Sequence, residues 1–319
     1  TMLEHILVPL DGSPLAESVL PHAVALAHAF EPRVSLLHVV QRDVAPDMIP
    51  TMDPLDWQLR RAEAEAYLEE VAARLRAENV QVDLAVAEGP AAERIIGYAR
   101  DEAVDLIVLA SHGRGGLSEW NISSIVQKVI LRSFLPTLVV RAYQPYSGEL
   151  GGLRYRRVLV PLDGSQRAEC VLPLAATLGR YYDATLILAH VVTRPEVPRH
   201  TPLTRDELAL VNQLTERNRA EAERYLEELQ PQLATKVESR LVVHTNTALA
   251  LHELVDQEGV DLVVLSAHGY SGETRWPYGS VALNIIVYGT TPLLIVQDLS
   301  PEEIQRSPAE TAFMERKGH

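Results

Sequence analysis

The chain has 319 residues, with 29 lysines and arginines against 43 aspartates and glutamates, so its formal net charge is −14. A surface this acidic repels phosphate backbones and anionic lipid head groups, so we expect neither nucleic acid nor a membrane surface as a partner. The length predicts two domains. The single cysteine, Cys170, excludes an intramolecular disulfide, and no export signal or membrane-spanning apolar run is visible, so we expect a cytoplasmic protein.

An internal repeat organises the chain. Residues 5–13, HILVPLDGS, return as residues 157–165, RVLVPLDGS, and residues 105–109, DLIVL, return as residues 261–265, DLVVL. Two copies of one unit of about 145 residues therefore fill the chain, and a solenoid of short repeats is excluded. We expect a first domain at 1–143, a linker rich in Pro and Gly at 144–154, a second domain at 155–298 and a polar tail at 299–319.

Within each copy, short aliphatic runs alternate with longer amphipathic stretches, which is typical of β-α-β units around a buried parallel sheet. In the first copy we expect strands near 4–9, 33–40, 80–87, 105–110 and 137–141. Pro21 falls inside the first helix and predicts a kink or a distorted turn. Long charged helices with a solvated face are expected from about Pro54 to Glu78 and from Thr204 to Leu229, and a short one from Ser300.

The first polar motif follows the first strand of each copy. It reads Asp11-Gly12-Ser13 in the first copy and Asp163-Gly164-Ser165 in the second. Open α/β sheets bind ligands at the carboxyl ends of their strands, so these side chains are candidate ligand contacts. Simple helix capping explains them equally well, and repetition does not separate the two interpretations because a cap would repeat too.

The second motif follows the fourth strand. In the first copy it consists of Ala110-Ser111-His112-Gly113, nine further residues and then Ser123-Ser124-Ile125. In the second copy it consists of Ser266-Ala267-His268-Gly269, nine further residues and then Gly279-Ser280-Val281. A turn of small residues before a helix presents backbone N–H groups that suit phosphate oxygens. An ordinary strand-loop-helix connection fits either copy alone at least as well. The aromatic residues of the second loop, Tyr270, Trp276 and Tyr278, are expected to pack the loop against its own domain rather than stack on a base.

As a set, these residues resemble the universal stress protein family, whose pattern is a Gly, two residues, a Gly, nine residues, a Gly and then Ser or Thr. The resemblance covers both halves and omits only linker and tail. It implies an α/β fold with two Rossmann-like domains, each a five-stranded parallel sheet of order 3-2-1-4-5 with helices on both faces. It also implies bound ATP, ADP or AMP and pairing of the two halves as an intramolecular pseudo-dimer, and it leaves a further homodimer open.

The resemblance carries over to named residues. In the first copy the nucleotide would be lined by Pro9, Leu10, Asp11, Val39, Leu109, Ala110, His112, Gly113, Ser123, Ser124 and Ile125, and apart from the resemblance Arg114 gives this loop a cation. In the second copy it would be lined by Pro161, Leu162, Asp163, Val191, Leu265, Ser266, His268, Gly269, Gly279, Ser280 and Val281. Asp11 would accept hydrogen bonds from the ribose, the Val39 backbone would pair with adenine, and Ser124 would donate to a phosphate. Because neither loop carries a lysine, we expect a triphosphate to bring Mg²⁺ with it.

The departures from the pattern leave alternatives open. Ser123 stands where the family has its third Gly, and we expect it to obstruct phosphate or to strain a turn that requires positive φ. A nucleotide-free interaction module with degenerate sites is therefore the rival to a regulatory or protective nucleotide binder. No catalytic residue and no metal site is assigned, and at most a slow ATPase is expected. His112 and His268 are interpreted as turn residues with locally bonded rings, and Cys170 as a packing residue within a helix.

Overall fold

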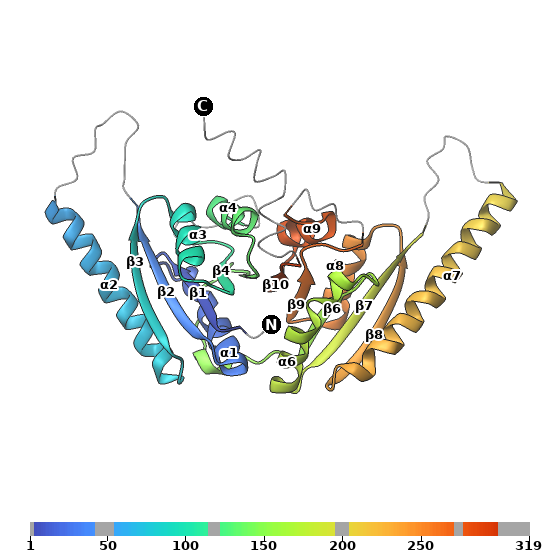
Figure 1. Cartoon of the computed structure of the whole chain (residues 1–319), viewed down its shortest axis with the longest axis horizontal. Coiled ribbons are helices and arrows are strands. Elements are labelled where there is room, and N and C mark those ends of the chain that lie inside the picture. Colours follow the sequence, from blue (N-terminus) through green and yellow to red (C-terminus); the bar gives the residue numbers. More distant parts are fainter. Residues whose placement is uncertain (1–2, 42–53, 114–121, 195–203, 271–276, 299–319) are drawn as a thin grey trace, which may run out of the picture. The chain divides into compact units, whose positions relative to one another are not determined.

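A computed structural model describes residues 3–41, 54–113, 122–194, 204–270 and 277–298 (Figure 1). The chain divides into two compact units, unit 1 at Thr1–Arg154 and unit 2 at Tyr155–His319. Among the described residues, no helix combines the length and the apolar character needed to cross a membrane. Arg114, Trp276 and the short helix expected at Ser300 lie outside the described residues.

Unit 1 is built on a parallel sheet in which the strands follow the order β3-β2-β1-β4-β5. The strands are β1 (His5–Leu10), β2 (Arg33–Val40), β3 (Val82–Glu88), β4 (Leu106–Ala110) and β5 (Thr137–Val140). The helices are η1 (Ala16–Val19), α1 (Leu20–Phe30), α2 (Pro54–Ala77), α3 (Ala91–Asp101) and α4 (Ser124–Ser133), with a 3-10 turn η2 (Leu150–Gly152). Both α2 and α3 contact β2 and β3, from opposite faces of the sheet (Figure 1).

Unit 2 repeats the arrangement, with strands in the order β8-β7-β6-β9-β10. The strands are β6 (Arg157–Pro161), β7 (Thr185–Thr193), β8 (Lys236–His244), β9 (Leu262–Ser266) and β10 (Leu293–Val296). The helices are α5 (Gln166–Glu169), α6 (Leu172–Tyr182), α7 (Arg205–Leu229), η3 (Gln230–Gln232), α8 (Thr247–Glu258) and α9 (Ser280–Tyr288). The α/β fold with a parallel sheet in each half, expected from the sequence, is confirmed.

The first helix of each unit is split near a proline. In unit 1 a 3-10 turn, η1, precedes α1, and Pro21 lies in the first turn of α1. In unit 2 the short α5 precedes α6, whose first turn holds Pro173. Proline has no N–H to donate, so it is accommodated where a helix starts and no partner is needed. The distorted turn predicted at Pro21 is therefore present.

The long helices are amphipathic despite their charge. The buried side chains of α2 recur every three or four residues, so that one face packs on the sheet while the rest is solvated. They are Ala64, Leu68, Val71, Ala72 and Leu75. The helix α7 begins where predicted, because Thr204 Oγ1 accepts from the Glu207 N–H at 3.3 Å and a Glu207 carboxylate oxygen accepts from the Thr204 N–H at 2.9 Å.

Candidate functional site

In unit 1 the candidate site lies where β1 and β4 end. Asp11 follows β1 directly, and Gly113 lies three residues beyond β4. A Cβ atom on Gly113 would lie 2.1 Å from Asp11 Oδ2, so the loop backbone lies against the carboxylate and a larger residue would displace the Asp11 side chain. The register pairs Leu10 with His38, which places Val39 of β2 beside Asp11. The structure therefore brings together three of the predicted ligand residues from three different segments.

The base of the unit 1 loop is held by Ser111 and His112, whose side chains are buried. The Ser123 N–H donates to the Ser111 carbonyl at 2.8 Å, so the two ends of the loop meet. Ser111 Oγ accepts from the Ala142 N–H at 2.9 Å and lies 3.0 Å from His112 Nδ1. A hydroxyl that accepts from an amide can still either donate to or accept from a ring nitrogen, so the tautomer of His112 sets the direction of this bond. The local hydrogen bond expected for His112 is confirmed.

Ser123 is the N-cap of α4, with φ −72° and ψ 159°. Its Oγ accepts from the Val126 N–H at 3.3 Å, which satisfies one of the free donors of the first turn. Its counterpart Gly279 has nearly the same backbone, with φ −68° and ψ 163°. The expectation that this position requires positive φ was wrong, because a helix N-cap has extended backbone that any residue adopts.

In unit 2 the carboxylate of Asp163 is bonded to the chain, and in unit 1 Asp11 Oδ1 likewise accepts from the Ser13 N–H at 2.9 Å. Asp163 Oδ1 accepts from the Ser165 N–H at 3.0 Å and from the Ser165 hydroxyl at 2.6 Å, while Oδ2 accepts from the Tyr270 N–H at 2.5 Å. A Cβ atom on Gly269 would lie 2.1 Å from Asp163 Oδ2, which repeats the contact of unit 1. The Asp163 side chain therefore holds the start of the second loop.

His268 is bonded differently from His112. Its Nδ1 lies 2.7 Å from Oδ1 of Asp298, and both side chains are almost completely buried. The other carboxylate oxygen of Asp298 lies 3.5 Å from Nε of Arg167 in α5. The partner of His268 Nδ1 is not local in the sequence, because Asp298 lies 30 residues further along the chain. Sequence reasoning missed Asp298, since the first copy has Ala142 at that position and gives no signal.

Cys170 lies between α5 and α6, so the prediction that it belongs to the interior of a helix was wrong. It is half-buried, and its Sγ lies 3.6 Å from the Ser266 hydroxyl. Burial raises the pKa of the thiol, and the nearby Asp298 carboxylate adds to this, although the hydrogen bond to Ser266 acts against it. A thiol held protonated is a poor nucleophile, which agrees with a packing role.

A tyrosine–glutamate hydrogen bond ties the long helix of each unit to the segment after the Asp-Gly-Ser turn. Tyr67 of α2 donates to Glu17 Oε1 at 3.2 Å, and Tyr225 of α7 donates to Glu169 Oε1 at 3.0 Å. The rings of these tyrosines lie 5.9 Å from the ring of His38 and 6.2 Å from that of His190. Burial, followed by the glutamate and then the site aspartate, raises the pKa of both phenols, so they stay protonated donors.

The remaining predicted residues lie at the ends of the same strands or in the first turn of the following helix. In unit 1 these are Pro9, Leu10, Leu109, Ala110, Ser124 and Ile125, and in unit 2 they are Pro161, Leu162, Val191, Leu265, Ser266, Ser280 and Val281. Tyr270 is 86% exposed, so the expected packing of this ring against its domain was wrong, whereas Tyr278 is buried. In the described part of the chain, no three His, Cys, Asp or Glu side chains are grouped to hold a metal ion.

The sequence profile of the universal stress protein family matches residues 2–141 and 154–297. The chain belongs to the universal stress protein family. Universal stress protein YxiE of Bacillus subtilis strain 168 is 30% identical over 149 residues, which are 44% of this chain and 100% of that protein. Universal stress protein Mb2028c of Mycobacterium bovis is 24% identical over 298 residues, 92% of this chain and 96% of that one, so this relative spans both halves.

Solved universal stress proteins share the fold. A crystal structure from Archaeoglobus fulgidus DSM 4304 has a TM-score of 0.64 at 17% identity and covers 92% of this chain and 98% of that chain. Another solved universal stress protein is in complex with cAMP; it is 25% identical and covers 46% of this chain and 100% of that chain, with a TM-score of 0.35. The first likeness concerns the fold, and the bound cAMP is a property of that other universal stress protein.

Proposed function

We propose that this tandem universal stress protein binds an adenine nucleotide in one or both halves. In this proposal it acts in the cytoplasm as a regulatory or protective stress-response protein rather than as a strong catalyst. The observation that carries the proposal is the contact of a carboxylate with a glycine at the carboxyl edge of each sheet, Asp11 with Gly113 and Asp163 with Gly269. The carboxylate can accept from ribose hydroxyls, and a glycine at the start of the loop lets phosphate oxygens approach its backbone N–H.

The roles of the other residues follow from their places. The backbone of Val39, beside Asp11, would pair with adenine, and the exposed Ser124 in the first turn of α4 would donate to a phosphate. Val191 and Ser280 would act in the same way in unit 2. Because the described residues form no group of metal ligands, Mg²⁺ would be held mainly by the phosphate oxygens and enter with the nucleotide.

A nucleotide-free interaction module with degenerate sites is the second candidate. It is favoured by one observation, the bonding of the site carboxylates to the chain: Asp163 accepts from Ser165 and Tyr270, and Asp11 accepts from Ser13, so a ribose must compete with donors of the chain itself. The sequence pattern also favoured this rival because of Ser123, but the cap geometry of Ser123 removes the expected strain.

The nucleotide content of the purified chain tests the proposal. Protein prepared without added nucleotide and then denatured should release ATP, ADP or AMP in up to two equivalents, identified by chromatography. If neither release nor calorimetric binding of ATP with Mg²⁺ is detected, the nucleotide proposal is lost and the interaction module stands.

Two glycine substitutions assign the sites. Gly113→Ala forces Asp11 away from the loop, and Gly269→Ala does the same to Asp163, so each should weaken binding in its own half at least tenfold, measured by calorimetry. Gly97→Ala in α3 is the matched control, because its new Cβ would meet nothing within 4 Å. Unchanged affinity in both site variants would contradict the assignment.

Replacing Ser123 by Gly separates the two candidates further. Tighter ATP binding in Ser123→Gly would show that the hydroxyl obstructs phosphate in unit 1. No binding in either half, with or without the change, would support the interaction module.

On the family resemblance alone we also propose that the two halves pair within the chain. Sedimentation at several protein concentrations tests the assembly: a constant mass of one chain is expected for an intramolecular pair, whereas a mass that doubles with concentration indicates a further homodimer.

A further inference from the structure

One buried carboxylate connects three segments of unit 2. Asp298 follows β10, and its Oδ1 accepts from Nδ1 of His268, which lies in the loop after β9, at 2.7 Å. Its Oδ2 lies 3.5 Å from Nε of Arg167, in the helix after the Asp163-Gly164-Ser165 turn. The carboxylate side chain is 1% exposed and that of His268 is 0% exposed. The two segments that carry the candidate ligand residues are thus joined to the end of β10 through this one side chain.

His268, which is bonded to Asp298, is next in sequence to a residue of the candidate site. Gly269, next to His268, lies against Asp163, and the Gly279 N–H donates to the carbonyl of Ala267 at 2.8 Å. A shift of the His268 side chain therefore moves the backbone on both sides of the loop. Charged and titratable groups around His268 are Asp298 after β10, Arg167 of α5, Cys170 after α5 and Asp163 after β6.

In unit 1 the loop after β4 is joined to the end of β5 without a charged side chain. At the positions of Asp298 and Arg167 it has Ala142 and Leu15, and the base of its loop is joined to the end of β5 by the Ser111 hydroxyl. The two partners differ chemically, because a carboxylate such as Asp298 can only accept from His268, whereas the Ser111 hydroxyl can accept from or donate to His112. Only His268 therefore needs a hydrogen on Nδ1 for its bond.

We propose that Asp298 is a positioning residue of the nucleotide site of unit 2, holding its phosphate loop through His268 and its Asp-Gly-Ser turn through Arg167. This inference rests on the proposed function. Affinity in unit 2 then depends on the contacts of a buried carboxylate, and affinity in unit 1 does not. Asp298 Oδ1 accepts from His268, whereas Oδ2 has no hydrogen-bond donor among the described residues and lies 3.5 Å from the partly exposed Arg167. Removing the carboxylate leaves His268 Nδ1 without this acceptor and Arg167 without this charge partner.

The test uses the full chain with Gly113→Ala, so that ATP with Mg²⁺ reports on unit 2 alone. Adding Asp298→Ala, the residue of unit 1, should weaken binding at least tenfold in calorimetry. Asp298→Asn should recover most of the loss, because its amide oxygen still accepts from His268 Nδ1. Glu258→Ala is the control, since it alters unit 2 at the amino end of the sheet and should leave ATP affinity within twofold.

A second readout does not need nucleotide. Imidazole ¹⁵N shifts should show hydrogen on Nδ1 of His268 in the parent chain and its loss from that atom in Asp298→Ala, and amide exchange at 268–270 and 277–279 should rise at least tenfold. A change of affinity below twofold in Asp298→Ala overturns the inference and leaves the proposed function intact. If the Gly113→Ala chain binds no ATP, the proposed function fails for unit 2 and so does the nucleotide part of the inference. Unchanged exchange in Asp298→Ala then overturns the loop-holding part as well.

Discussion

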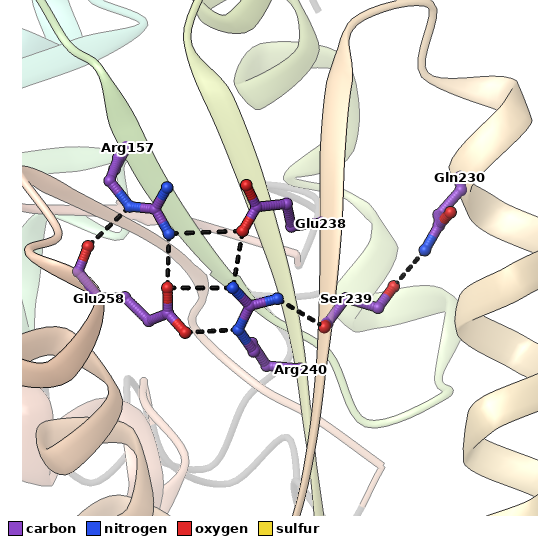
Figure 2. A network of polar contacts seen from close by, with 6 residues as sticks. All are labelled: Arg157, Gln230, Glu238, Ser239, Arg240 and Glu258. Carbon is purple, nitrogen blue, oxygen red and sulfur yellow. Dashed lines mark hydrogen bonds and ion pairs between the residues drawn. The ribbon is translucent and has the colours of Figure 1, made fainter.

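The amino ends of the two sheets carry different polar side chains at corresponding positions. In unit 2, the guanidinium groups of Arg157 and Arg240 face the carboxylates of Glu238 and Glu258 (Figure 2). Arg157 Nη2 lies 2.5 Å from Glu258 Oε2, and Arg240 Nη2 lies 2.7 Å from Glu238 Oε2. Two cations and two anions neutralise each other across β6, β8 and the end of α8.

In unit 1 a single buried histidine occupies the position of Arg157. His5 Nε2 lies 2.7 Å from the Ser35 hydroxyl, and Nδ1 lies 3.0 Å from the Glu102 carbonyl oxygen. Arg33 approaches the same carbonyl with Nη2 at 3.2 Å. The first strands align with the second in the same register, His5 with Arg33 and Arg157 with Thr185. The repeat has therefore kept its backbone geometry, while polar side chains changed as whole sets.

The largest expected difference is that lowering the pH should destabilise unit 1 more than unit 2. Burial lowers the pKa of His22 in α1 from 6.5 to about 4, whereas unit 2 has Leu174 at the same position. The unfolded chain then binds the proton more readily, so stability is present above pH 6.5 and is lost as the pH falls toward 4. The full loss is about 3 kcal/mol. His22→Leu should remove this dependence, measured by amide exchange of unit 1 peptides between pH 7.5 and pH 4.5.

Unit 2 peptides are the internal control for that experiment. Burial also lowers the pKa of His190, although less than that of His22, so these peptides should lose less protection than unit 1 peptides between pH 6.5 and pH 5. If His22→Leu loses stability on acidification as steeply as the parent chain, burial of this imidazole is not the cause.

Breaking the charged network should have a smaller effect. Glu258→Ala leaves Arg157 and Arg240 with only Glu238 as a shared acceptor, and because both arginines are partly exposed we expect a loss of about 1–2 kcal/mol in denaturant unfolding. The hydrogen bond from Arg240 holds the pKa of Glu258 below 4.5, so this contribution is present above pH 4.5 and is lost as the pH falls further. The matched control is Glu102→Ala, since unit 1 uses only the carbonyl of Glu102.

The outcome for the network is judged against that control. Equal losses in Glu258→Ala and Glu102→Ala would show that the ion pairs add nothing beyond helix propensity. A loss confined to Glu258→Ala that shrinks in high salt would support the network.

The smallest expected effect concerns Ser35. Ser35→Ala removes the hydroxyl from His5 Nε2 in a buried position, which should cost about 1 kcal/mol in unit 1. Ile187 holds the same place in unit 2, where no hydrogen bond is lost, so Ile187→Val provides a matched change of a buried side chain. A stability of Ser35→Ala equal to that of the parent chain would show that His5 finds another partner.

The fold followed from the sequence because it depends on patterns that recur. Short apolar runs, helix formers and the repeat itself fix the strands and their parallel arrangement, and observed boundaries differ from the predicted ones by one or two residues, as for β3 at Val82–Glu88 against 80–87. The approach of Asp11 to Gly113 follows from the same source, since both positions end neighbouring strands of the sheet.

The contacts that were not predicted depend on three-dimensional proximity or on local backbone geometry. Asp298 was missed because its partner lies in another segment and the first copy has alanine there. Ser123 was misjudged because a family glycine suggests positive φ, whereas the structure uses that position as an extended N-cap. Cys170 was placed inside a helix because the break between α5 and α6 leaves the apolar pattern almost unchanged.

The tyrosine–glutamate hydrogen bonds fix a point on each long helix, and the length of helix between that point and the helix start can be compared. Tyr67 lies 13 residues from the start of α2, and Tyr225 lies 20 residues from the start of α7. At 1.5 Å per residue these lengths are about 20 Å and about 30 Å. Tilting either helix by about 5° at its tyrosine therefore displaces the distant end by about 2 Å in α2 and about 3 Å in α7. A given tilt about the tyrosine would therefore move the helix start further in unit 2 than in unit 1.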